Sequence, residues 1–176
     1  MNYFEFYSIP VSFYPDEALL KKQFYALSKE YHPDFYAAES DEKQQEVLEL
    51  STLNNKAWQT LSSFDKRLHY VLTLEGVLED GDQYKLPQSF LMDMMEVNEA
   101  LMDLEMEANE ELFAQLDKQI KAMEDEINQS ITEATKTFED TKAADRQVVL
   151  AEIKDLYYRK KYLLRIRDSL NRFAAR

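Results

Sequence analysis

Glycine is almost absent from this chain: only Gly76 and Gly81 occur among 176 residues. Phosphate-binding loops and dinucleotide-binding turns need several glycines close together, because the backbone must approach the ligand closely there. An all-β fold needs many tight turns, in which glycine is a favoured residue. The sequence therefore predicts an all-α protein.

Both glycines lie in one short segment, 76–87, which also contains acidic residues and ends in a proline. Glycine, proline and charged residues that cluster between periodic apolar stretches are typical of a connecting segment. A chain of this length can form one domain or two small ones. We therefore expect a first domain over residues 1–75, a linker over 76–87 and a second domain over 88–176.

The first half has the apolar spacing of paired helices. A helix start is predicted at residues 14–17, where a proline and two acids occur together, and Pro33 ends this helix. A second helix is predicted over about 40–62, antiparallel to the first, and a short one over about 65–74. The apolar stripes of the first two helices are Leu20, Phe24, Leu27 and Tyr31, and Val47, Leu50, Asn54, Ala57 and Leu61.

The second half contains three longer segments with helical periodicity, at about 88–107, 110–140 and 143–173. In the middle segment, apolar residues between Leu112 and Phe138 recur at intervals of three and four, which is close to a heptad seam. Three such helices joined by short loops predict an antiparallel bundle.

Charge is abundant and segregated along the chain. The 34 acids and 21 bases give a net charge of -13, which disfavours a nucleic-acid partner because phosphate binding needs a basic surface. Residues 88–140 contain 15 acids and 3 bases, whereas residues 141–176 contain 4 acids and 10 bases. We expect these opposite charges to pair between neighbouring helices of the bundle.

Several classes of protein are disfavoured by what the sequence lacks. Without cysteine, no disulfide, thiolate metal ligand or cysteine nucleophile can form. No uncharged apolar run approaches the roughly 18 residues of a membrane span, and no basic residue precedes Lys21, so no leader sequence is recognised. We expect a cytoplasmic protein with no membrane partner, cofactor, metal ion or catalytic residue of its own.

One short motif, His32-Pro33-Asp34, directly follows the first long helix. A histidine and a carboxylate at this spacing can form a catalytic dyad, but no nucleophile is evident beside them. The motif can also be an ordinary helix stop, in which Pro33 breaks the helix and Asp34 forms an Asx turn. Taken alone, the helix stop is the simpler interpretation.

In its context, the motif resembles the signature of a J domain. A helix ends in Tyr31-His32-Pro33-Asp34, a second helix contains the run 54–61 (Asn-Asn-Lys-Ala-Trp-Gln-Thr-Leu), and residues 65–70 (Asp-Lys-Arg-Leu-His-Tyr) are similar to a fourth J-domain helix. With a short linker, a three-helix bundle and the run Phe90-Leu91-Met92, the chain resembles the HscB family, the co-chaperones of iron–sulfur cluster assembly. This resemblance covers nearly the whole chain.

The resemblance implies that the loop and the basic face of the preceding helix dock on a DnaK-type or HscA-type chaperone and stimulate its ATP hydrolysis. Lysine side chains can steer such a helix toward an acidic surface. One departure from the family pattern is Phe35, because many J domains continue with lysine at this position. The implied chaperone-binding residues are Lys21, Lys22, Lys29, His32, Pro33 and Asp34.

Methionine gathers on the first helix of the predicted bundle, where five of the chain's seven methionines lie between Met92 and Met106. One face of this helix, from Phe90 to Ala108, supplies an apolar stripe for the bundle. A second face combines methionines with carboxylates, which suits an adaptable protein-binding surface. Alternatively, both faces are buried between the neighbouring helices and the first domain.

In the HscB family the corresponding surface binds the IscU-type scaffold, so the resemblance implies scaffold binding for the methionine-containing face. An aromatic residue of the last helix, Tyr158, is aligned with a further family contact, and the neighbouring Tyr157 is an alternative. The implied scaffold-binding residues are Leu91, Met92, Met95, Glu96, Glu99, Asp103 and Tyr158.

The resemblance thus implies a co-chaperone that stimulates a DnaK/HscA-type ATPase and delivers an IscU-type scaffold to it, with catalysis left to the partner. Two alternatives are also compatible with the sequence. The chain is either a J-domain co-chaperone for another client, or a non-chaperone helical assembly protein in which the motif at His32 is an ordinary turn. A substitution of His32 that abolishes ATPase stimulation without loss of helicity would be incompatible with the ordinary turn.

Overall fold

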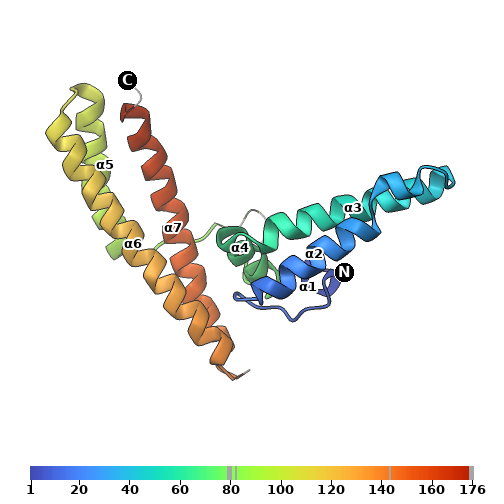
Figure 1. Cartoon of the computed structure of the whole chain (residues 1–176). Helices are drawn as coiled ribbons and strands as arrows, with labels where there is room; N and C mark the ends of the chain where they lie inside the picture. The colour runs from blue at the N-terminus through green and yellow to red at the C-terminus, as the bar shows by residue number, and fades with distance from the viewer. Residues whose placement is uncertain (79–80, 82, 143, 175–176) are drawn as a thin grey trace. The chain divides into compact units, whose positions relative to one another are not determined.

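The computed structural model of the chain is helical and divides into two compact units, Met1–Leu78 and Glu79–Arg176 (Figure 1). No β-strand occurs among the residues that the structure describes, and the predicted all-α class is confirmed. Each unit has its own set of buried apolar side chains. The described residues are 1–78, 81, 83–142 and 144–174.

The first unit is built on an antiparallel helix pair, α2 (Glu17–Glu30) and α3 (Asp41–Leu61). The short 3-10 helix η1 (Pro33–Tyr36) lies in their connection, and α1 (Tyr3–Phe6) and α4 (Phe64–Leu74) pack against α3. The predicted helix pair and the helix after it are confirmed. The sequence did not predict α1 or η1, because four residues are too few to display a helical period.

Polar side chains define where the helices of the first unit begin. At α1, Asn2 and Glu5 form a capping box, in which each side chain accepts the backbone N–H of the other residue. The side chains of Asp16 and Ser40 accept a backbone N–H three residues ahead, at 2.9 Å in α2 and 3.3 Å in α3. These caps satisfy donors that have no partner inside the helix, so they explain the observed helix starts.

A buried polar cluster around Asn54 connects three segments of the first unit. Asn54 lies on α3, is 1% exposed, and donates through Nδ2 to the carbonyl of Phe24 at 3.1 Å and to the hydroxyl of Ser28 at 2.9 Å. Its Oδ1 accepts from the hydroxyl of Tyr7 at 2.8 Å. Burial raises the pKa of Tyr7 well above its usual value, so this phenol stays protonated and donates. The cluster therefore joins α3 to α2 and to the end of α1.

The guanidinium of Arg67 is a second buried polar group of the first unit. Arg67 lies in α4 and donates through Nε to the carbonyl of Phe13 at 2.8 Å and through Nη1 to the carbonyl of Leu61. Burial lowers the pKa of this side chain. Both acceptors are backbone groups, so Arg67 ties the segment before α2 and the last residue of α3 to α4.

The second unit is a three-helix bundle of α5 (Gln88–Met106), α6 (Glu110–Asp140) and α7 (Arg146–Ala174), as predicted. α6 and α7 pack along one another, and α5 packs against both (Figure 1). The apolar stripe of α5 is buried up to Leu104. The prediction is wrong at the last position of the stripe, because α5 ends at Met106 and Ala108 is exposed beyond it.

The expected charge pairing between helices of the bundle is confirmed at Arg167 of α7. Its Nε and Nη2 donate to the two carboxylate oxygens of Glu124 at 3.1 and 2.8 Å, and its Nη1 donates to Asp117. Both carboxylates belong to α6. These hydrogen bonds raise the pKa of Arg167, so its charge persists at any physiological pH.

The helix before the predicted linker ends at Leu74, and Gly76 follows with a φ of +70°, which only glycine adopts without strain. Glu79, Asp80 and Asp82 of the predicted linker lie outside the described residues. Residue 143, the first of the last predicted segment, also lies outside them. None of the described helices combines the length and the apolar character that crossing a membrane requires.

Candidate protein-binding surfaces

The His32-Pro33-Asp34 loop forms a compact turn at the end of α2. The backbone N–H of Asp34 donates to Nδ1 of His32 at 3.3 Å, and Nδ1 lies 3.7 Å from the Asp34 carboxylate. A ring nitrogen that accepts this N–H is unprotonated, so the proton of the neutral imidazole lies on Nε2. Pro33 occupies the first position of η1, where its missing N–H leaves no donor unsatisfied. The turn therefore holds the imidazole with Nε2 available as a donor.

The side chains of this loop are accessible to a partner. The side chain of His32 is 52% exposed and that of Asp34 is 85% exposed. Phe35 is 68% exposed, and its ring centroid lies 5.5 Å from that of His32. Tyr36 turns back toward α2 and donates its hydroxyl to the carbonyl of Glu30 at 2.9 Å. The loop thus presents an imidazole, a carboxylate and an aromatic ring next to one another.

The three predicted lysines are all exposed on α2. Lys29 lies in the last turn, directly before the loop, and Lys22 lies about 10 Å further back along the helix axis. Between them lies Tyr25, which is 60% exposed and was not predicted as a site residue. Spacings of three and four place Lys22, Tyr25 and Lys29 on one side of the helix. Lys21, one turn before Tyr25, borders the same side.

Within the second unit the second face of α5 is exposed, so the neighbouring helices of the bundle do not bury it. The exposed fractions are 40% for Leu91, 60% for Met92, 61% for Met95, 62% for Met102 and 86% for Met106. By contrast, Met94 on the bundle face is 1% exposed. The carboxylates predicted beside this surface, Glu96, Glu99 and Asp103, are exposed as well. We call this set the methionine face: Leu91, Met92, Met95, Glu96, Glu99, Met102, Asp103 and Met106.

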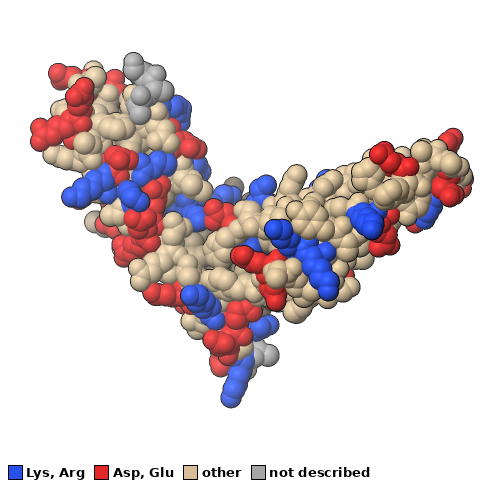
Figure 2. All heavy atoms as spheres, in the orientation of Figure 1, with Lys and Arg blue, Asp and Glu red and all other residues tan. Residues whose placement is uncertain are grey.

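Further acids lie beyond the methionine face. Figure 2 shows acidic side chains gathered at the end of the second unit where α5 joins α6. The exposed acids of this connection are Glu105, Glu107, Glu110 and Glu111. An apolar patch with a carboxylate rim is complementary to a partner that has an apolar site bordered by lysine or arginine.

The remaining predicted scaffold residue, Tyr158, is half-buried on α7. It stacks on Tyr84 with ring centroids 4.7 Å apart and an interplanar angle of 8°. The hydroxyl of Tyr84 donates to Asp155 at 2.7 Å, and burial together with this hydrogen bond raises the pKa of Tyr84 to about 12. Tyr157 is only 9% exposed and belongs to the core. Of the two tyrosines, Tyr158 therefore has the greater area available to a partner.

Tyr158 and the methionine face come from helices that touch one another. Tyr162 lies one turn after Tyr158 on the same side of α7. Its hydroxyl accepts from Nδ2 of Asn98 at 3.1 Å, and its ring meets Phe90 edge-on at 5.8 Å. Asn98 lies between Met95 and Met102 on α5. The side of α7 that carries Tyr158 therefore adjoins α5.

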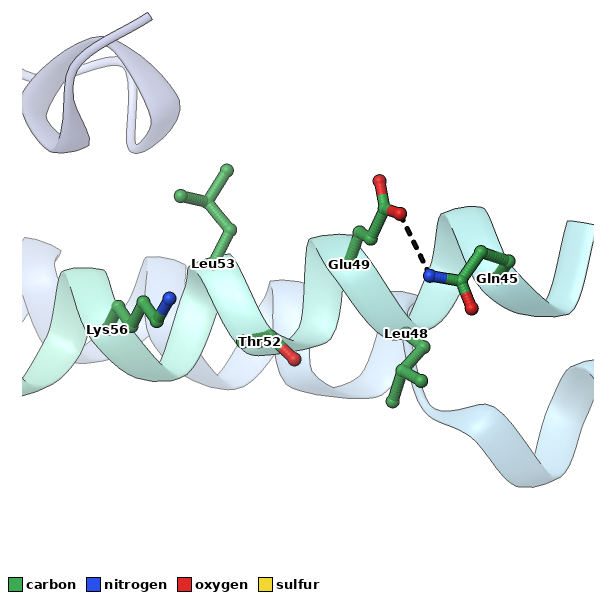
Figure 3. A pocket seen from close by; sticks show the side chains of 6 residues that line it. All are labelled: Gln45, Leu48, Glu49, Thr52, Leu53 and Lys56. Carbon is green, nitrogen blue, oxygen red and sulfur yellow. Dashed lines mark hydrogen bonds between the residues drawn. The ribbon is translucent and has the colours of Figure 1, made fainter.

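A hollow on α3 has none of the predicted site residues. Figure 3 shows that its lining side chains all come from this one helix, and that Gln45 donates to Glu49, at 2.9 Å. It offers one carboxylate and one amine, but no histidine and no base-activated nucleophile. Across the described residues, no three His, Asp or Glu side chains gather in a way that could hold a metal ion. The lining residues are Gln45, Leu48, Glu49, Thr52, Leu53 and Lys56.

Comparisons with known proteins agree on one family. A family model described as the HSCB C-terminal oligomerisation domain matches residues 86–171. Proteins named co-chaperone protein HscB homolog, from two strains of Vibrio cholerae serotype O1 (M66-2 and Classical Ogawa 395), are each 38% identical to this chain over 102 residues. The matched part is 57% of this chain and 60% of each relative, so the match spans less than two thirds of their length.

Solved structures resemble the chain over almost its whole length. The chaperone HscB from Vibrio cholerae is 28% identical and matches with a TM-score of 0.58, covering 97% of this chain and 99% of that one. The human co-chaperone protein HscB is also 28% identical and matches with a TM-score of 0.70, covering 97% of this chain and 81% of that one. These matches extend over both units of the fold.

Proposed function

Because this chain belongs to the HscB family, we propose that it is a co-chaperone of iron–sulfur cluster assembly. In this role it stimulates the ATPase of a DnaK/HscA-type chaperone and delivers an IscU-type scaffold to that chaperone in the cytoplasm. The observation that carries the proposal is the presence of two different exposed surfaces on two units, the His32 loop on the first and the methionine face on the second.

Chaperone docking is supported by the geometry of the His32 loop. Nε2 of His32 is available as a donor, the carboxylate of Asp34 is an acceptor, and both are held by a short turn that Pro33 begins. Little side-chain and backbone freedom is lost when a preformed turn docks. Lys22 and Lys29 on the adjoining helix add long-range attraction to an acidic partner. ATP hydrolysis is the chemistry of the chaperone, and the loop acts on that chaperone by binding.

Scaffold binding is supported by the methionine face. Methionine is unbranched and polarisable, so it can adapt to an irregular partner surface. The exposed methionines lie next to Glu99 and Asp103, and an apolar centre with a charged rim is the usual arrangement of a protein interface. We propose that Met92 and Met95 are central contacts and that the two carboxylates are rim contacts. Tyr158 supplies an aromatic edge from α7.

No cysteine is available to hold a cluster on this chain, so the scaffold carries the cluster in this scheme. The protein contributes no ligand to the iron and needs no cofactor. Its contribution is to bring client and ATPase together on one polypeptide, which raises the effective concentration of one for the other.

The docking half of the proposal is tested by His32→Gln in an ATPase assay with a purified DnaK-type chaperone. The chain has only two histidines, so His69→Gln, on exposed α4 surface, is a matched control. We expect His32→Gln to lose at least about tenfold in stimulation, as for the loss of a central interface contact. His69→Gln should stimulate as the wild type does. Equal stimulation by both variants, with unchanged helicity, would refute docking through the loop.

The proposal that the methionine face binds the scaffold is tested by titration calorimetry with a purified IscU-type scaffold. We expect Met92→Ala and Met95→Ala each to cost about 1 to 3 kcal/mol of binding free energy, with circular dichroism unchanged. Val148→Ala is the matched control, because Val148 is an apolar side chain of α7 that is 74% exposed. If the folded wild type does not bind the scaffold, the bundle has another client. If it binds and both methionine variants bind equally well, the site lies elsewhere.

A further inference from the structure

We propose that Tyr25 and Phe35 are apolar anchors of the chaperone-docking surface, so that the chain binds its ATPase chaperone by burying aromatic rings as well as by charge. The inference rests on the proposed function, since it concerns the same docking surface. The partner it requires is a chaperone face that combines apolar side chains with carboxylates.

Phe35 is placed so that a partner that contacts His32 must also cover its ring. The N–H of Phe35 donates to the carbonyl of His32 at 3.1 Å, which closes a tight turn. The two ring centroids are 5.5 Å apart. Because Phe35 is 68% exposed, most of its ring is in water until a partner arrives. A flat protein surface that reaches the imidazole therefore removes the phenyl ring from water.

The outward direction of Phe35 follows from the anchoring of its neighbour. Tyr36 is half-buried, and its hydroxyl donates to the carbonyl of Glu30 at 2.9 Å, which holds it against the end of α2. In a 3-10 helix, side chains one residue apart point about 120° away from each other. With Tyr36 held against α2, Phe35 points to solvent. Tyr36 is thus packed and hydrogen-bonded within the chain, whereas Phe35 stays exposed.

Tyr25 provides a second exposed ring on the same surface. It is 60% exposed, and its ring centroid lies 5.4 Å from that of Phe24. It lies three residues after Lys22 and four residues before Lys29, which puts all three side chains on one side of α2. The basic side of this helix therefore has an aromatic ring at its middle. Carboxylates of a partner that pair with the two lysines bring that partner over the ring.

Apolar burial and charge attraction respond differently to salt, and this difference makes the inference testable. The attraction of exposed lysines is screened, since the Debye length falls from about 10 Å at 0.1 M to about 3 Å at 1 M ionic strength. Burial of a phenyl or phenol ring is not weakened by moderate salt. We therefore expect Phe35 to keep its contribution to chaperone binding at a salt concentration that removes most of the contribution of Lys29 to the same binding.

The experiment measures how much full-length protein gives half-maximal ATPase stimulation of a purified DnaK-type chaperone, at about 0.05 M and about 0.3 M salt. We expect Phe35→Ala and Tyr25→Ala each to raise this concentration about five- to twentyfold at both salt concentrations. Phe35→Leu, which keeps most of the apolar area, should change it less than about threefold. Lys29→Ala should raise it at low salt and have little effect at high salt. Val148→Ala is the control for loss of an exposed apolar side chain elsewhere.

A failure of the aromatic anchors can be distinguished from a failure of chaperone docking itself. If the wild type stimulates the chaperone and Phe35→Ala and Tyr25→Ala match it, the aromatic anchors are refuted and the docking function stands. If the loss caused by Phe35→Ala disappears at high salt, as for Lys29→Ala, the ring does not act by burial and the inference is also refuted. If the wild type does not stimulate at all, the docking function fails and this inference with it. Circular dichroism of each variant establishes that it is folded.

Discussion

Asn54 illustrates at the scale of one residue how a polar side chain can specify the arrangement of helices. Its amide nitrogen and its carbonyl oxygen are both satisfied, by groups from α2 and from the end of α1. An apolar residue at this position would fill the space, but its packing would be compatible with several relative orientations of these segments. The hydrogen bonds select one of them, because each buried polar atom is otherwise left without a partner.

We expect Asn54→Leu to destabilise the first unit by about 2 to 4 kcal/mol, because it removes the three side-chain hydrogen bonds of Asn54 from a buried position. The hydroxyl of Tyr7 then keeps only its 3.1 Å hydrogen bond to the backbone carbonyl of residue 54. Tyr7→Phe should cost less, about 1 kcal/mol, since Asn54 keeps its contacts with α2. Urea unfolding followed by circular dichroism measures both. Equal stability of Asn54→Leu and the wild type would show that the cluster contributes nothing net.

The rate at which each methionine is oxidised should depend on how deeply its side chain is buried. Hydrogen peroxide transfers one oxygen atom to a thioether sulfur, giving sulfoxide and water, and exposed sulfurs react first. We expect Met92, Met95, Met102 and Met106 to be oxidised well before Met94, which is 1% exposed. Peptide mass spectrometry after brief peroxide treatment gives the rate for each residue. Oxidation of Met94 at the same rate as Met95 would contradict the bundle packing of α5.

Among the elements of the fold, the long helices could be predicted from the sequence and the short ones could not. The periods of three and four around Leu20 and Ile120 predict α2 and α6, whereas α1 and η1 consist of four residues each and have no period to detect. The end of the stripe on α5 was misplaced by four residues beyond Leu104, because an exposed alanine and a buried one look the same in a pattern of apolar residues.

From the sequence we named those candidate contact residues that belong to a motif or to a periodic pattern, and we did not name residues that only their exposure distinguishes. His32 and Asp34 are recognisable as a motif, and Met92 and Met95 by periodicity. Tyr84 was missed because its partner Asp155 is 71 residues away, a separation that no local pattern contains. Tyr25 and Phe35 were not named as candidate contacts because aromatic residues are usually buried, and only the structure reveals that these two are exposed.

The segment that leads into α5 is attached to α7 through Tyr84, and this attachment should depend on pH. The pKa of Tyr84 is raised to about 12 in the fold, above its unfolded value of about 10. Its stabilising contribution is therefore complete below pH 10 and is lost as the pH rises through 12. We expect the wild type to be more stable than Tyr84→Phe by about 1 kcal/mol at pH 8, and this difference to shrink between pH 10 and 12. Urea unfolding of both proteins across this range measures it.

At the scale of the whole molecule, the division into two units allows each to be followed separately. The only tryptophan, Trp58, lies on α3, with its ring centroid 4.8 Å from that of Phe24. Its fluorescence therefore reports on the first unit, whereas circular dichroism reports on the helices of both. Each unit has its own core, so we expect separate unfolding transitions.

We expect Arg167→Ala to destabilise the second unit by about 1 to 2 kcal/mol, because it removes the partner of Glu124 and Asp117 while both are partly exposed. The midpoint of the circular dichroism transition that belongs to the second unit should fall, and the midpoint of the Trp58 fluorescence transition should not move. Lys121→Ala is the control, because Lys121 pairs with Asp125 on the open surface of α6. Equal shifts of both probes would mean that the chain unfolds as one cooperative body.

The segregation of charge in the bundle has a consequence for how the protein is made. The ribosome synthesises α5 and α6 before α7, as a strongly acidic stretch with 15 acids and 3 bases over residues 88–140. The bases of α7, among them Arg167, offset the repulsion among these acids and are synthesised after them. We therefore expect the nascent α5 and α6 to pack firmly only when α7 has been made. The last helix of the bundle then sets the moment at which the bundle closes and the methionine face acquires its support.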